Sequence, residues 1–181
     1  CAAAICMQKG IFQRDIYTNH TKELQQHLLK DDQTIWGLCN EDPADLAKTA
    51  AIHASSENLS KGGTAANIIN GYLRSTADCC NASISEDTGL PQSITLTWPH
   101  PVTASEVRIT TDTDLTYPRF SVWEIPPFGL TAKNLTVECL SDSEIVRTLS
   151  ITDNYRRQMR LQFPPTVFDS LRITVTETSG D

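Results

Sequence analysis

The sequence contains no hydrophobic run long enough to cross a membrane as a helix. It has no block of basic residues either, and 15 Lys and Arg against 22 Asp and Glu give its 181 residues a formal net charge of -7 at pH 7. Nucleic acids and anionic lipids are recognised largely through positive charge. These absences argue against a nucleic acid and against a membrane as partners.

Sequence signatures of common catalytic and metal sites are missing as well. There is no C-x-x-C pair for zinc, no H-E-x-x-H and no G-x-S-x-G, and none of the four histidines is paired with another ligand at helical spacing. We therefore expect no catalytic residue in this chain. The six cysteines are expected to be mostly free thiols, because a chain of this length can bury a core without disulfide bonds.

Residues 1–48 are predicted to form a helical segment. Its alanine-rich start, CAAAICM, favours a helix that Gly10 ends. Lys22 to Lys30 places leucines on one side of a second helix, with Thr21 as the expected N-cap. Because the first helix has no N-cap of its own, we expect this chain to be part of a longer protein.

From about residue 49 the spacing of apolar residues changes to two, which is typical of strands. Ile94, Leu96 and Trp98, for example, alternate with serine and threonine, and turn signals such as Pro126-Pro127 separate the runs. The sequence therefore predicts a mainly β domain over 49–181, an antiparallel jelly-roll β-sandwich preceded by the short helical segment. The expected strands cover 50–54, 93–98, 107–109, 120–122, 135–139, 145–151, 156–163 and 171–175.

Several short stretches of this β domain occur in an informative order. They are 52–57 (IHASSE), 65–71 (AANIING), 89–98 (GLPQSITLTW), 101–109 (PVTASEVRI) and 171–178 (LRITVTET). Together they resemble discoidin-like, galactose-binding-like domains, in which an A-S-S-E strand is followed by an A-x-x-x-x-D-G turn. The resemblance spans residues 50–181 and implies a galactose-binding-like β-sandwich with a carbohydrate or glycoconjugate as partner.

The front of the chain resembles a different family. Residues 1–7, Asp15-Ile16 and 23–32 (ELQQHLLKDD) look like the end of the flavin domain in bacterial FAD-dependent oxidoreductases. In that family a glycine-rich turn runs into an alanine-rich helix whose N-terminus faces the FAD pyrophosphate. The glycine-rich turn is missing here, so no FAD-binding residue is assigned.

This second resemblance implies that the chain is the C-terminal fragment of such an enzyme. Residues 1–48 would then be the remnant of the FAD-binding domain, and residues 49–181 a separate β-sandwich domain. FAD would belong to the parent protein, whose flavin domain is the expected partner, and not to this fragment. Relatives of the parent type are often exported, which favours an extracytoplasmic location in a bacterium.

Two loops of the β domain carry residue types that bind sugars. Such sites combine an aromatic ring, which contacts the apolar face of the sugar, with charged or amide groups that bind its hydroxyls. The first loop supplies Tyr117 and Arg119, and the second supplies Asn154, Tyr155 and Arg156. The alternative for both loops is a tyrosine that packs at a strand end and an arginine that faces solvent.

The resemblance to discoidin-like domains also implies a possible calcium site. Many domains of this fold hold a structural Ca²⁺ near the D-G turn and the last strand through oxygen ligands. Here Asn70 replaces the aspartate of that turn, and Thr76 and Glu177 are the other candidate ligands. The replacement leaves the site with one carboxylate fewer.

Two functions are consistent with this sequence. The first is an accessory carbohydrate-binding-type module at the C-terminal end of an FAD-dependent oxidoreductase. The second is a structural or interaction domain that packs on the flavin domain and binds no sugar. An exposed, concave cluster around Tyr117, Arg119 or Tyr155 would favour the first, and a flat apolar patch would favour the second.

Overall fold

The alanine-rich start of the chain forms a helix, as predicted. In the computed structural model, which describes residues 1–76, 78–112 and 131–180, helix α1 (Ala2–Lys9) ends at Gly10, whose φ of 64° is left-handed. Helices α2 (Gln13–Asn19) and α3 (Thr21–Lys30) follow. No helix in the described ranges is long and apolar enough to span a membrane.

Two details of the helical segment differ from the prediction. Helix α2 was not expected, because its residues, QRDIYTN, show no apolar stripe. Thr21 is the first residue of α3 and not its N-cap, a position taken by His20. The Thr21 hydroxyl instead donates to the carbonyls of Ile16 and Tyr17, at 3.3 and 2.8 Å, and so joins α3 to the end of α2.

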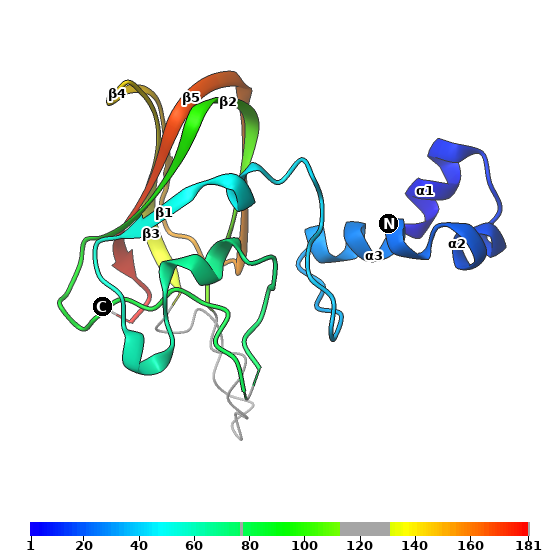
Figure 1. Cartoon of the computed structure of the whole chain (residues 1–181), viewed down its shortest axis with the longest axis horizontal. Helices are drawn as coiled ribbons and strands as arrows, with labels where there is room; N and C mark the ends of the chain where they lie inside the picture. The colour runs from blue at the N-terminus through cyan, green and yellow to red at the C-terminus, as the bar shows by residue number, and fades with distance from the viewer. Residues whose placement is uncertain (77, 113–130, 181) are drawn as a thin grey trace.

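Within the described part of the β domain, five strands form an antiparallel sheet in the order β1-β2-β5-β3-β4. The short first strand lies at one edge and β4 at the other, while the long strands β2 and β5 lie side by side and curve together (Figure 1). The fold class is thus mainly β and antiparallel, preceded by short helices, as predicted. The strands are β1 (Ala51–Ala54), β2 (Gln92–Thr110), β3 (Ala132–Ser141), β4 (Glu144–Ile151) and β5 (Gln158–Thr178).

The strands β2 and β5 are each longer than the sequence predicted. The predicted strands ended at 98 and 163, just before prolines at 99, 101, 164 and 165, but β2 and β5 continue through these positions. The β2–β5 pairing shifts register between Thr97 and Val102 and again between Ala104 and Glu106. Irregular pairing of this kind tolerates proline, because some backbone N–H groups then have no partner in the ladder. The predicted strand 120–122 lies outside the described residues.

Side chains alternate between the two faces along the regularly paired parts of the central strands. The inner face presents apolar residues such as Leu96 and Leu171, whereas the outer face presents Thr95, Arg172 and Glu138 directly opposite one another. Trp98 and Phe168 meet edge to face at 5.7 Å in the core. All six cysteines are free, and burial raises the pKa of the Cys139 thiol.

Candidate functional site

The predicted sugar-binding loop Asp153–Arg157 forms a tight turn between β4 and β5. Asn154 is only 8% exposed, and its side-chain amide donates to the carbonyls of Ala132 and Arg156 at 2.9 and 3.0 Å. Its carbonyl oxygen accepts the Arg156 N–H at 3.0 Å. Both the nitrogen and the oxygen of this amide are hydrogen-bonded to backbone groups. Asn154 therefore fixes the shape of the turn, and its neighbours Tyr155 and Arg156 face solvent.

Those neighbours are the exposed part of the turn. The ring of Tyr155 is 62% exposed, and the guanidinium carbon of Arg156 lies over it, 5.7 Å from the ring centroid. This is a cation–π geometry, which brings the two exposed side chains together. Tyr155 and Arg156 together form what we call the Tyr155 platform, an aromatic surface with hydrogen-bond donors beside it.

The other predicted pair, Tyr117 and Arg119, lies outside the described residues. The residues that flank that stretch are nonetheless close to the turn. Thr111 donates its N–H to the Arg157 carbonyl at 2.8 Å, and the Thr131 hydroxyl donates to the Asp112 carbonyl at 3.3 Å. The connection between β2 and β3 therefore starts and ends beside the Tyr155 platform.

Arg157 is a residue of this turn that the sequence did not single out. Its side chain is 16% exposed and bonds to Asp32, to the Thr111 carbonyl and to the Leu73 carbonyl. Nothing in the sequence distinguishes it from the adjacent Arg156, since its partners are distant along the chain. Arg157 holds the turn in place, whereas Arg156 faces solvent.

Two of the three candidate calcium ligands, Asn70 and Glu177, already use side-chain oxygens as hydrogen-bond acceptors. Asn70 bonds to Asn81 and to the Tyr72 N–H, both at 2.8 Å, and the Thr76 N–H donates to the Cys79 carbonyl at 2.9 Å. No three His, Cys, Asp or Glu within 1–76, 78–112 and 131–180 are grouped so that they could hold a metal ion.

The carboxylate of Glu177 is the acidic member of that candidate set. It accepts hydrogen bonds from Lys133 and Asn134, and the Glu177 contact raises the pKa of Lys133. Ca²⁺ takes six or more oxygen ligands, which these residues do not present as an open set. Calcium binding by Asn70, Thr76 and Glu177 therefore stays a prediction.

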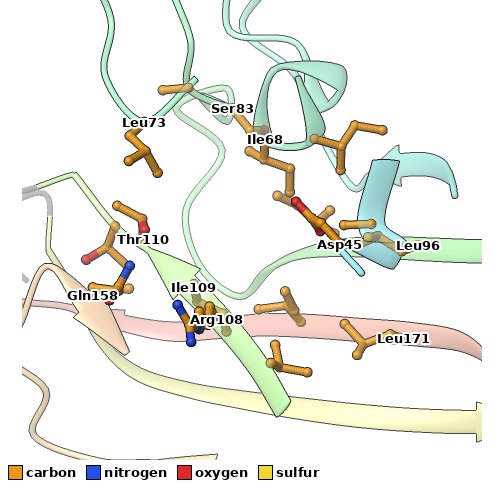
Figure 2. Close-up of a pocket in the computed structure, with 18 of the residues that line it drawn as sticks. Asp45, Ile68, Leu73, Ser83, Leu96, Arg108, Ile109, Thr110, Gln158 and Leu171 are labelled. Atoms are coloured by element: carbon orange, nitrogen blue, oxygen red, sulfur yellow. The ribbon is translucent and has the colours of Figure 1, made fainter. Parts of the chain in front are cut away.

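A cavity of about 1100 Å³ lies between the inner face of the sheet and the irregular segment that covers it (Figure 2). Core side chains, among them Leu96 and Leu171, form much of its lining. Two of the polar side chains in the close-up, Arg108 and Gln158, both donate to the Lys30 carbonyl. Exposed side chains such as Tyr72 and Leu90 also line the cavity, so it is open to solvent on one side. The Tyr155 platform is the candidate site that the sequence predicted.

Comparison with known proteins identifies the fold. No family model and no curated protein matches the sequence. A fucose-binding module from Streptococcus pneumoniae matches with a TM-score of 0.58 and 12% identity, over 74% of this chain and 87% of that one. Chitosan-binding module 2 of a chitosanase/glucanase from Paenibacillus sp. IK-5, in complex with chitotriose, matches with a TM-score of 0.54 and 16% identity, over 75% and 89%.

A third similar structure is the family 32 carbohydrate-binding module of C. perfringens NanJ in complex with galactose. It matches with a TM-score of 0.50 and 17% identity, over 75% of this chain and 88% of that one. At such low identity the likeness shows the fold alone. The predicted galactose-binding-like β-sandwich is thereby confirmed, and the structures that share it are carbohydrate-binding modules.

Proposed function

We propose that the chain is a carbohydrate-binding module and that the Tyr155 platform contacts the sugar. The observation that carries this proposal is the exposed Tyr155–Arg156 pair at the end of a sheet whose fold is shared with carbohydrate-binding modules. The similar modules are described as binding fucose, chitosan and galactose. A sugar of this general kind is the proposed ligand.

The chemistry of the platform suits a sugar. The C–H groups on one face of a pyranose pack on a tyrosine ring, and a guanidinium donates to the hydroxyls at the edge. Asn154 fixes the turn through backbone contacts, so Tyr155 needs little ordering when a sugar binds. Loss of one aromatic contact of this kind costs about 1–1.5 kcal/mol, or roughly tenfold in affinity.

The second part of this proposal concerns the parent protein of the module and its location. The resemblance of residues 1–32 to the end of a flavin domain favours an FAD-dependent oxidoreductase as the parent protein, in an extracytoplasmic bacterial location. Four large apolar side chains of the N-terminal region are 80–86% exposed, namely Met7, Phe12, Tyr17 and Trp36. They favour a role of this region in docking, which is also the alternative function for the whole chain.

Isothermal titration with fucose, galactose and chitotriose tests the sugar-binding proposal. Tyr155→Ala is expected to weaken binding about tenfold without a change in melting temperature. Tyr17→Ala is the matched control, because Tyr17 is also an exposed tyrosine, 86% accessible, but lies on helix α2. Equal binding by wild type and Tyr155→Ala would move the site elsewhere. No binding of any sugar by the folded wild type would favour the docking function.

A further inference from the structure

The helices and the sheet have separate hydrophobic cores. Ile5, Ile16 and Leu29 are buried within the helices, and none of them belongs to the cluster that forms the core of the sheet. Residues 1–32, which we call the helical arm, lie to one side of the sheet (Figure 1). The position of the arm therefore depends on polar contacts of α3. Lys22 and Gln26 bond to residues 39–41, and further contacts lie at the C-terminal end of the arm.

The contacts at that end are polar. The carbonyl of Lys30, the last residue of α3, accepts hydrogen bonds from Arg108 at 2.7 Å and from Gln158 at 3.3 Å. The last carbonyls of a helix have no partner within it, and a positive charge there also suits the helix dipole. Two strands of the sheet, β2 and β5, thus cap the end of the arm.

Arg157 makes one of the ionic contacts of this joint, beside the ion pair of Lys30 with Asp42. Its Nε lies 2.9 and 3.2 Å from the two carboxylate oxygens of Asp32, and both side chains are about 15% exposed. Its other nitrogens donate to the Thr111 carbonyl at 3.3 Å and to the Leu73 carbonyl at 2.6 Å. All three guanidinium nitrogens are used, in a fork that lysine cannot reproduce.

The same residue ends the turn that carries the Tyr155 platform. The Arg157 carbonyl accepts the Thr111 N–H at 2.8 Å, so both its backbone and its side chain fix the turn to β2. Asp32 has φ of 61° and reaches the turn through Arg157. The arm and the platform therefore share one side chain.

We propose that Arg157 is a positioning residue that couples the helical arm to the Tyr155 platform. When Arg157 is bonded to Asp32, the arm is docked and the turn is held. Loss of that contact releases both, so a partner that draws the arm away also loosens the platform. Such coupling needs no contact between the partner and the sugar, because the Arg157–Asp32 ion pair holds both the arm and the turn.

Hydrogen exchange of the full-length chain, followed by mass spectrometry, tests this coupling without a sugar. In Arg157→Gln, amides of 28–45 and of 153–157 are expected to exchange at least tenfold faster, while those of β3 keep the wild-type rate. Arg157→Lys should show the same faster exchange, because lysine cannot reproduce the forked hydrogen bonds of the guanidinium. Arg172→Gln is the matched control, since Arg172 is an arginine of β5 that bonds to Glu138 on the outer face of the sheet.

The decisive variant is Asp32→Asn. Asparagine keeps the size of the side chain and tolerates a positive φ, so this variant is expected to fold even if Arg157→Gln does not. Faster exchange of 153–157 in Asp32→Asn would support the coupling. Wild-type exchange in that turn, with or without faster exchange in the arm, would overturn it. A uniform rise that includes β3 would also overturn it, because it would show a general loss of stability.

Discussion

Glu106 gives the most quantitative prediction. This β2 carboxylate is 23% exposed and accepts hydrogen bonds from Arg108, Arg160 and Gln162. Partial burial alone would raise the pKa of the carboxyl group, but these hydrogen bonds outweigh it and lower the pKa from 4.5 to about 2. The folded state thus binds a proton on Glu106 less readily than the unfolded chain.

The size of the effect follows from that difference. A pKa lowered from 4.5 to about 2 corresponds to about 3 kcal/mol of stability. Because the folded-state pKa is the lower one, this contribution is complete above pH 5 and declines as the pH falls from 5 towards 2. About 2 kcal/mol of it should be lost by pH 3. Glu106→Gln removes the group that titrates.

Urea unfolding at several pH values between 7 and 2.5 measures this prediction. Glu106→Gln should be less stable than wild type by up to about 3 kcal/mol at pH 7 and by about 1 kcal/mol at pH 3. The exposed Glu144→Gln, on the edge strand β4, controls for the loss of one negative charge. A difference between wild type and Glu106→Gln that is the same at pH 7 and pH 3 would refute the reasoning.

Three further predictions concern stability. Phe168, 1% exposed, packs on Trp98, so Phe168→Ala should lower the free energy of unfolding by about 3–5 kcal/mol in urea; a loss under 1 kcal/mol would contradict the buried core. Ser143 has φ of 70° in the β3–β4 turn, so Ser143→Gly should raise the same free energy by about 0.5 kcal/mol, and a decrease would contradict the left-handed turn. Because Glu177 is already bonded, calcium should leave the melting temperature unchanged in thermal-shift assays. A rise in melting temperature with calcium that is lost in Glu177→Gln would instead show that calcium binds at Glu177.

The sequence predicted where the strands lie better than where they end. Alternation of Ile94, Leu96 and Trp98 with hydroxyl residues identified the start of β2, because one face of the sheet is buried and the other is not. The continuation of β2 through Pro99 and Pro101 depends on shifts in its pairing with β5. Those shifts depend on β5, which lies about 60 residues further along the chain. The local sequence of β2 does not reveal them.

The candidate site was predictable in the same partial way. A turn with aromatic and charged residues was visible in Asp153–Arg157, and the exposure of Tyr155 agrees with that expectation. The burial of Asn154 was not visible, since its amide bonds to Ala132, 22 residues earlier. Arg156 and Arg157 are identical residues with opposite roles, and the difference arises from Asp32, 125 residues from Arg157.

The position of β5 in the sheet has a consequence for the order of folding. The strand at 158–178 pairs with β2 on one side and with β3 on the other, so it joins the two halves of the sheet. During synthesis, β1 and β2 can form only a two-stranded ribbon until β5, which begins at residue 158, is being made. The apolar face of that ribbon would meanwhile be open to solvent, and pairing over so long a loop is slow. Nascent chains that stop within β5 should therefore be the species that chaperones bind.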